Sequence, residues 1–175
     1  TDMKKNPDFQ TTIFGKKIYS YAVKMMGKRS FMPIKFEGYW KDVGTIDSLW
    51  EANMDLLDKN NALDLNDPAW KIYTEDPTTP PHYIGPNADI KRSFITQGCM
   101  IDGEVKNSVL FTSAKIDTGA RVIDSVLMPG VIVEAGAVVQ RALVADGVRI
   151  GKNAVVGSPG SEHIELVAKR VKGAE

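Results

Sequence analysis

The stretch that decides the fold runs from Ser108 to Ser158 and reads SVLFTSAKIDTGARVID (108–124), SVLMPGVIVEAGAVVQR (125–141) and ALVADGVRIGKNAVVGS (142–158). These three segments align without gaps at a period of 17 residues. A shorter copy, SFITQGCMIDGEVKN (93–107), precedes them, with two residues deleted after Gly103, and part of a further copy begins at Ile84. A repeat of this kind indicates a solenoid of stacked coils.

Three columns of this alignment hold only aliphatic residues, and within a full copy they lie six, six and five residues apart. Such spacing predicts three short strands per coil, each with one large side chain directed inward. The columns are Ile84, Ile101, Ile116, Val133 and Ile150; Ile90, Val105, Val122, Val139 and Val156; and Ile95, Leu110, Leu127 and Val144. An ordinary α/β domain with a valine-rich region remains the alternative, because buried strands are aliphatic in any fold.

Columns of small residues favour the solenoid over that alternative. Alanine recurs where the interior is expected to be narrow, at Ala88, Ala120, Ala137 and Ala154. Residues that tolerate positive φ recur where a corner is expected. These are Asn87, Gly119, Gly136 and Asn153, and also Gly98, Gly130 and Gly147, with Ser113 as the exception in its column. Corner columns at a constant offset from the aliphatic columns seldom arise by chance, so we predict a mainly β protein built on a parallel β-helix.

The rest of the chain predicts two further parts. Residues 1–58 have the pattern of an incomplete α/β domain, with a helix near 14–26, a strand near 31–36 and a helix from Ile46 to Asp58 that Thr45 caps. Its apolar face comprises Ile46, Leu49, Trp50, Met54 and Leu57. Residues 59–83 read as a proline-rich linker, and residues 84–175 as the β-helix domain, in which 163–171 forms a last, capping strand.

One further column of the repeat, Val109, Val126 and Leu143, lies next to the core column and is also apolar. An apolar row on the outside of a solenoid suits packing. We therefore expect this row to pack on another domain or subunit.

Composition excludes several classes of function. Lys+Arg and Asp+Glu balance at 22 each, so no overall charge attracts the chain to nucleic acid or to an anionic membrane. No apolar run suits a membrane span, and the single cysteine, Cys99, excludes an intrachain disulfide, so we expect a cytoplasmic protein. The two histidines, His82 and His163, lie off the regular coils. A three-histidine zinc site and an acyltransferase base on a coil are therefore both disfavoured.

The one segment that suggests chemistry is the glycine-bracketed turn GYWKDVGT, from Gly38 to Thr45. Asp42 is a short carboxylate at the end of a predicted strand, as Mg²⁺ sites often require. The other interpretation is that Asp42 is only a turn residue and that Tyr39 and Trp40 belong to the core. No glycine-rich phosphate loop occurs anywhere, so the nucleotide-binding half of such an enzyme would have to lie outside this chain.

The segment EGYWKDVGTIDSLWEANMDLL (37–57), with the repeats NSVL (107–110) and DSVLMPGV (124–131), resembles the bacterial glucose-1-phosphate adenylyltransferases, and the likeness extends from about Phe14 to Val156. The resemblance implies a left-handed β-helix of hexapeptide repeats preceded by an incomplete nucleotidyltransferase segment. It implies that Asp42 is a catalytic ligand of Mg²⁺ and that Trp40 and Tyr39 contact substrate. Related guanylyltransferases and thymidylyltransferases share the Trp-x-Asp-x-Gly turn, so the base and the sugar stay open.

By this resemblance the parent enzyme makes ADP-glucose and pyrophosphate from ATP and glucose-1-phosphate for glycogen synthesis. It is expected to be a homo- or hetero-tetramer regulated by a small metabolite. Because the partner carboxylate and the phosphate loop are absent, the chain by itself is expected to be inactive. The alternative is a non-catalytic regulatory subunit, against which the intact Asp42 turn argues.

Overall fold

The computed structural model describes residues 37–60, 63–65, 67–69 and 78–174. The chain divides into two compact units, Thr1–Glu37 and Gly38–Glu175, and the description below concerns the second. The helix predicted near 14–26 and the strand predicted near 31–36 lie outside the described residues.

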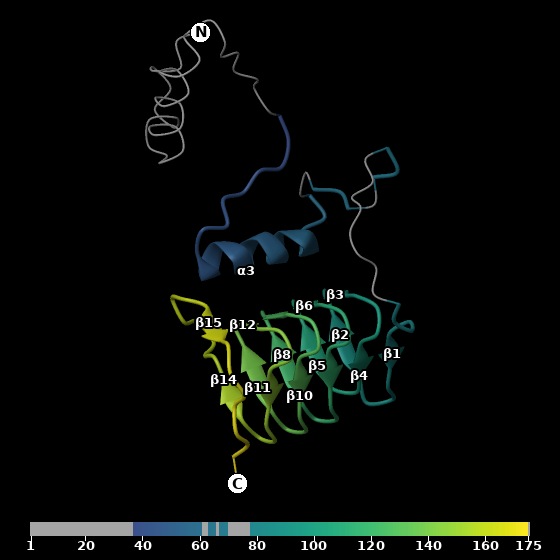
Figure 1. Cartoon of the computed structure of the whole chain (residues 1–175), viewed down its shortest axis with the longest axis vertical. Helices are drawn as coiled ribbons and strands as arrows, with labels where there is room; N and C mark the ends of the chain where they lie inside the picture. The colour runs from purple at the N-terminus through teal and green to yellow at the C-terminus, as the bar shows by residue number, and fades with distance from the viewer. Residues whose placement is uncertain (1–36, 61–62, 66, 70–77, 175) are drawn as a thin grey trace, which may run out of the picture. The chain divides into compact units, whose positions relative to one another are not determined.

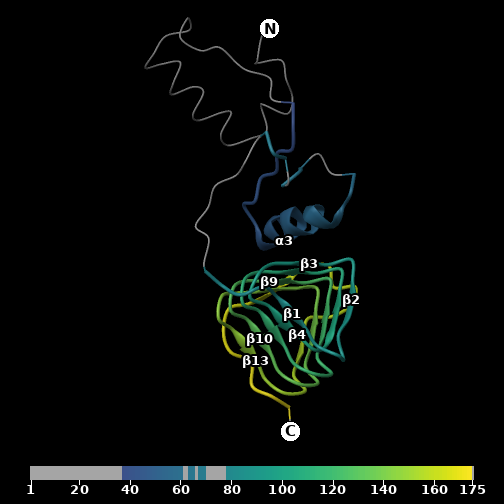
Figure 2. The same ribbon diagram turned by 90° about the vertical axis from the view of Figure 1, so that its right-hand side faces the viewer.

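Three parallel sheets of five strands each form the β-helix, and every coil contributes one strand to each sheet (Figure 1). The first sheet comprises β1 (Tyr83–Ile84), β4 (Met100–Ile101), β7 (Lys115–Ile116), β10 (Ile132–Val133) and β13 (Arg149–Ile150). The second comprises β2 (Asp89–Lys91), β5 (Glu104–Lys106), β8 (Arg121–Ile123), β11 (Val138–Gln140) and β14 (Val155–Val156). The third comprises β3 (Phe94–Ile95), β6 (Val109–Leu110), β9 (Val126–Leu127), β12 (Ala142–Val144) and β15 (Glu165–Val167). Figure 2 looks along the stack of coils.

The strand register confirms the predicted repeat. In the first sheet Ile84 pairs with Ile101, Ile101 with Ile116, and Val133 with both Ile116 and Ile150. The other two aliphatic columns pair in the same way within the second and third sheets. From the second coil onward the column residues are almost completely buried and form one continuous cluster. Because each coil covers the apolar face of the next, the stack buries a core that no single coil could bury.

The corners of the coils follow the predicted columns with one error and one addition. Gly119, Gly136 and Asn153 have φ of 73°, 73° and 57°, as expected. Asn87 was predicted to share this conformation, and that was wrong, since it lies outside the left-handed region. Its backbone and side-chain nitrogens instead donate to Asp102, at 3.0 and 3.1 Å. Ser113, the exception by residue type, nevertheless has φ of 62°.

A second set of corners carries no glycine and was not predicted. Arg92, Asn107, Asp124 and Arg141 all have φ between 44° and 48°. Buried serines follow two of these corners: Ser108 Oγ donates to the Lys106 carbonyl at 2.7 Å and accepts from the Ser125 N–H at 3.1 Å. Ser125 repeats the pattern with Ile123 and Ala142. The hydroxyls therefore accept from the Ser125 and Ala142 N–H groups, so that these buried donors are satisfied at the corner.

The capping strand predicted within 163–171 is present. β15 pairs in parallel with β12, and Val167 extends the third aliphatic column beyond Val144. Val171 then forms a bridge to Ile150 in the first sheet. This segment covers two strand edges at the C-terminal end of the solenoid, which would otherwise be open to another chain.

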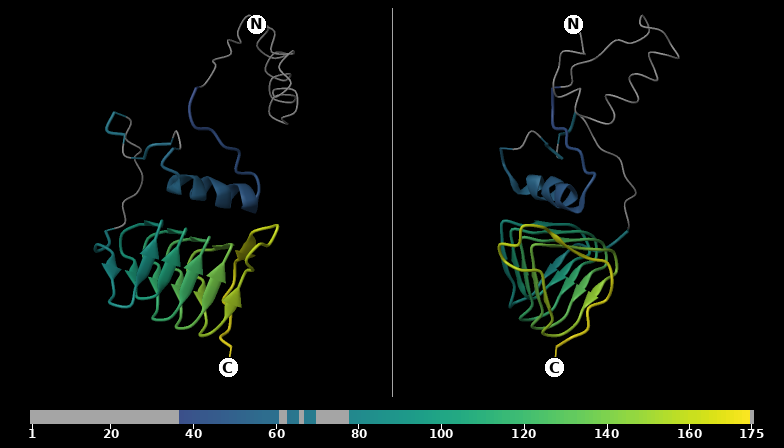
Figure 3. Two further views of the ribbon diagram at one scale, coloured as in Figure 1. Left: turned by 180° about the vertical axis from the view of Figure 1, so that it is seen from behind. Right: turned by 90° about the vertical axis from the view of Figure 1, so that its left-hand side faces the viewer.

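Helix α3 (Ile46–Met54) and the 3₁₀ turn η4 (Asp55–Leu57) precede the β-helix in sequence. The predicted apolar face of this segment packs on Val109, Val126 and Leu143, the row expected to meet another domain or subunit. The residues that pack there are Ile46, Leu49, Trp50, Met54 and Leu57. The third sheet is thus covered on its outer side by a helix of the same chain (Figure 3).

Candidate functional site

The turn that carries Asp42 is held by side chains on either side of it. The Tyr39 hydroxyl donates to Asp55 Oδ2 at 2.9 Å, and the Lys41 ammonium donates to the same oxygen at 3.0 Å. Lys41 also lies 3.3 Å from a carboxylate oxygen of Glu51. A residue of η4 therefore fixes the segment that leads into the turn through two charge-assisted hydrogen bonds.

The end of the turn is fixed by the start of α3. Thr45 is the N-cap, as predicted: its Oγ1 accepts from the Ser48 N–H at 3.1 Å, and Ser48 Oγ accepts from the Thr45 N–H at 3.0 Å. This reciprocal capping box satisfies two amide groups that the first turn of a helix leaves without partners. Asp42, Val43 and Gly44 are the three residues left between Lys41 and the cap.

These contacts change the titration of two side chains. Burial, and then the hydrogen bond to Asp55, raise the pKa of the Tyr39 phenol. For Lys41 burial acts in the opposite direction, but the hydrogen bonds to Asp55 and Glu51 outweigh it and raise the pKa of the ammonium. Both groups therefore keep their protons at neutral pH, so the two bonds that hold the turn persist there.

The structure leaves the Asp42 carboxylate exposed, and Trp40 is 73% exposed. Gly44 lies beside this carboxylate, and a β-carbon there would make an ordinary van der Waals contact of 3.5 Å with Asp42 Oδ1. Tyr39 is half-buried, and its hydroxyl faces Asp55. All three predicted site residues thus lie on one turn, while their catalytic and substrate-binding roles stay predictions.

The residues present fit part of a magnesium site. Mg²⁺ in phosphoryl-transfer enzymes takes one or two carboxylates and completes its shell with water and phosphate oxygens. Asp42 is one such carboxylate, exposed and on a held turn. Among the described residues no group of three or more His, Cys, Asp or Glu side chains is placed to hold a metal ion. Any Mg²⁺ at Asp42 would therefore need further ligands from substrate, water or residues outside the described ranges.

Helix α3 is fixed to the β-helix by polar contacts from its first turn and from its middle. The Trp50 indole N–H donates to the Asp124 carbonyl at 2.9 Å, and the Arg141 guanidinium lies 5.5 Å from the centre of the Trp50 ring. Asp47 accepts from the Ile164 N–H at 2.8 Å and lies 3.4 Å from His163. The Ile164 bond, and then His163, lower the pKa of the Asp47 carboxyl.

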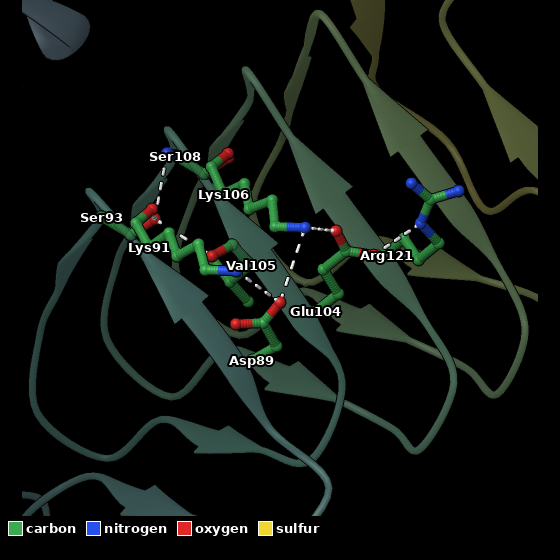
Figure 4. Close-up of polar contacts among 8 residues, drawn as sticks. All are labelled: Asp89, Lys91, Ser93, Glu104, Val105, Lys106, Ser108 and Arg121. Carbon is green, nitrogen blue, oxygen red and sulfur yellow. Dashed lines mark hydrogen bonds and ion pairs between the residues drawn. The ribbon is translucent and has the colours of Figure 1, made fainter.

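The coils themselves carry polar contacts whose arrangement is structural. On the outer face of the second sheet, Asp89, Lys106, Glu104 and Arg121 form an unbroken row of ion pairs across three strands (Figure 4). Each acid in this row has a basic partner, and no histidine lies on it. His82 is exposed in the connector and His163 pairs with Asp47, so neither supplies a general base on a coil.

Comparison with known proteins matches both parts of the chain. Residues 82–168 match the family model described as GlmU-like, C-terminal hexapeptide, and residues 2–59 match the model described as nucleotidyl transferase. The second match includes the whole Asp42 turn and α3.

Curated relatives agree with these two models. A glucose-1-phosphate adenylyltransferase of Acetivibrio thermocellus is 44% identical over 82% of this chain and 33% of the relative. One of Bacillus cytotoxicus is 41% identical over 95% of the chain and 44% of the relative, and one of Bacillus thuringiensis is 44% identical over 87% and 40%. This chain is a relative of the glucose-1-phosphate adenylyltransferases. It combines a nucleotidyl transferase segment with a hexapeptide β-helix.

The chain spans from 33% to 44% of the length of these adenylyltransferases. The likeness expected from the GYWKDVGT turn and the DSVLMPGV repeat is confirmed, and it supports a place among the nucleotidyltransferases. In the described part of the chain, no helix has the length and apolar character to span a membrane.

Proposed function

We propose that this chain is part of an enzyme that makes ADP-glucose and pyrophosphate from ATP and glucose-1-phosphate, for glycogen synthesis in the cytoplasm. The observation that supports the proposal most directly is the exposed Asp42 carboxylate on a held turn, in a chain 41–44% identical to glucose-1-phosphate adenylyltransferases. An aspartate on a turn without such contacts would have no fixed orientation. Because contacts on both sides of Asp42 fix the turn, its carboxylate can bind a ligand in a defined geometry.

In this reaction an oxygen of the sugar phosphate attacks the α-phosphorus of ATP, and pyrophosphate leaves. Catalysis then depends on holding the two phosphates in line and on offsetting the charge that develops between them. Mg²⁺, when bound, supplies that positive charge. Asp42 is the residue of this chain proposed to hold the ion, and the exposed Trp40 ring offers a flat face to sugar or base. Tyr39 contributes its ring to the same surface while its hydroxyl stays on Asp55.

The proposal extends to assembly and regulation. A homo- or hetero-tetramer regulated by a small metabolite remains our expectation for the complete enzyme. Because α3 already covers Val109, Val126 and Leu143, a subunit contact would have to use another surface of the β-helix. The row of ion pairs from Asp89 to Arg121 and the outer face of the first sheet remain exposed to such a contact in large part.

The test compares pyrophosphate release by the 175-residue chain with that of an enzyme carrying this chain as its C-terminal part, made by joining it behind the upstream part of the Acetivibrio thermocellus relative. We expect no turnover from the chain alone and ATP-dependent turnover from the joined enzyme. Asp42→Ala should lower kcat/KM on the order of 10²–10³-fold, the loss typical of removing one preorganised electrostatic contact. Its melting temperature should match that of the wild type, because the carboxylate is exposed.

The other outcomes separate the alternatives. Activity with GTP or dTTP in place of ATP would keep the nucleotidyltransferase class and change the base. If Asp42→Ala has wild-type kcat/KM, the metal role is wrong. If the joined enzyme is inactive with every sugar phosphate but changes the regulation of an active partner subunit, the regulatory-subunit alternative replaces the proposal.

A further inference from the structure

We infer that Asp55 is a positioning residue for the metal-binding turn, which it holds through Tyr39 and Lys41. The inference rests on the proposed function, because it takes Asp42 to be a ligand of Mg²⁺. It assigns the geometry of that ligand to a carboxylate that lies beyond the turn, in η4.

One oxygen of Asp55 connects the turn to the helical segment. Asp55 Oδ2 accepts both from the Tyr39 hydroxyl at 2.9 Å and from the Lys41 ammonium at 3.0 Å. The two donors are three residues and one residue before Asp42. On the far side, the Thr45 capping box fixes the chain to the first turn of α3. Only three residues therefore lie between fixed points, and Asp42 is the first of them.

The charges explain why a carboxylate is needed at position 55. Lys41 has its ammonium near the C-terminal end of α3, a helix without a basic residue in its last turn. A cation at that end offsets the partial negative charge of the exposed carbonyl groups. The Lys41 side chain is 24% exposed, so its ammonium is partly removed from water and needs an acceptor. Among the described residues, the ion pair left to Lys41 without Asp55 is the one with the more exposed Glu51, at 3.3 Å.

Helix α3 gives this arrangement a firm base. Trp50 and Asp47 connect α3 to the corner of one coil and to the segment before β15. The path from Asp42 through Lys41 and Asp55 to α3 and the β-helix consists of short polar contacts and packed apolar side chains. Supporting partners of a metal ligand act by fixing its orientation, so their loss weakens metal binding more than substrate binding.

The experiment measures metal binding in the joined enzyme with Asp42→Ala, Asp55→Ala, Asp55→Asn and Asp58→Ala. Asp58 is the matched control. It is an aspartate three residues after Asp55, and its carboxylate accepts from the Asn60 N–H at 2.9 Å. The readouts are Mn²⁺ affinity by electron paramagnetic resonance without turnover, and the Mg²⁺ concentration for half-maximal rate at saturating ATP and glucose-1-phosphate. Thermal melting of each variant reports on folding.

We expect Asp55→Ala to weaken Mn²⁺ binding and raise the Mg²⁺ requirement by about 10–100-fold, the usual effect of removing a support of a metal ligand. The KM for glucose-1-phosphate should rise less than the Mg²⁺ requirement, since Asp55 reaches the proposed substrate surface only through the Tyr39 hydroxyl. Asp55→Asn keeps an oxygen for the Tyr39 hydroxyl and should give an intermediate effect. Asp58→Ala should match the wild type.

Unchanged Mn²⁺ affinity in both Asp55 variants, with a lowered melting temperature, would make Asp55 a folding residue and overturn the inference. If Asp42→Ala also binds Mn²⁺ as the wild type does, the proposed metal role of Asp42 fails together with the inference. If Asp42→Ala loses Mn²⁺ and the Asp55 variants do not, only the inference fails.

Discussion

At the scale of single residues, the corners of the coils depend on backbone conformations that most side chains avoid. Gly157 follows β14 with φ of 74°, and a β-carbon added there would overlap the carbonyl oxygen of Gln140 in the coil before it. Gly119 has nearly the same φ, 73°, but the nearest atom to an added β-carbon is the Gly136 nitrogen at 3.9 Å. Comparing substitutions at the two glycines therefore distinguishes the cost of a positive φ, which both share, from the cost of close contact between coils, which arises at Gly157.

We expect Gly157→Ala to lower the free energy of unfolding by about 2–5 kcal/mol, the sum of conformational strain and forced displacement of a packed backbone. Gly119→Ala carries only the first cost and should lose about 1–2 kcal/mol. Urea denaturation of the 175-residue variants, followed by circular dichroism, measures both values. Equal losses would show that the coils move apart at Gly157 without resistance.

The residues of the candidate site were only partly accessible to sequence reasoning. Asp42, Trp40 and Tyr39 were proposed from the glycine-bracketed turn together with its resemblance to the adenylyltransferases, and their roles stay predictions. Asp55 was not proposed, although it sits in the segment that carried the resemblance. Its contacts with Tyr39 and Lys41 join residues 16 and 14 positions apart, across a turn whose path the sequence does not specify. The one available signal was a helix without a basic residue in its last turn and a lysine just upstream.

At the scale of elements, Trp50 holds α3 to the β-helix through both apolar packing and a hydrogen bond. The indole is packed among the apolar row of the third sheet and also satisfies the Asp124 carbonyl, at a corner where φ is 48°. A carbonyl at such a corner has no strand partner on that side, so a side-chain donor replaces the missing ladder bond.

We expect Trp50→Phe to lower the free energy of unfolding of α3 by about 1–2 kcal/mol, because the ring still packs but the carbonyl loses its donor. Hydrogen exchange of the α3 amides in the 175-residue chain measures this. Trp40→Phe is the matched control: the same substitution on a ring that is 73% exposed should leave exchange unchanged. Equal exchange in Trp50→Phe and the wild type would mean that the indole hydrogen bond does not help to hold the helix.

The elements that the sequence predicted were those whose residue pattern recurs in every coil. Each aliphatic column repeats an interior position, so chance identities average out, and the register followed the alignment. The corners at Arg92, Asn107, Asp124 and Arg141 were missed because their residue types vary from coil to coil. There the backbone is fixed by serine hydroxyls and strand pairing, which allow three different residue types in one conformation.

At the scale of the whole molecule, carboxylates that bridge coils connect the stability of the solenoid to pH. The pKa of Glu104 lies below its ordinary value because Lys106 and then Arg121 donate to it, and Asp89 is lowered by Lys91 and Lys106. Hydrogen bonds from Thr118 and Asn87 lower the pKa of Asp102, and Arg149 lowers that of Glu134. These four acids lie on three of the coils, and each contacts a residue of a neighbouring coil, so each favours the stacked state in its ionised form.

Because each folded-state pKa lies below the unfolded value, the stabilisation is complete above the ordinary values of 3.8 for Asp and 4.5 for Glu and is lost as the pH falls through the lowered values. We therefore expect a constant melting temperature from pH 8 to about pH 5 and a steady fall below about pH 4. Glu104→Gln removes the acid shared by two cations and should make the fall shallower, while lowering the melting temperature at pH 7. High salt should reduce the difference between the two proteins, since these groups are partly exposed. A wild-type melting temperature that rises on acidification would contradict this prediction, because it would show that repulsion among the carboxylates outweighs their pairing with the cations.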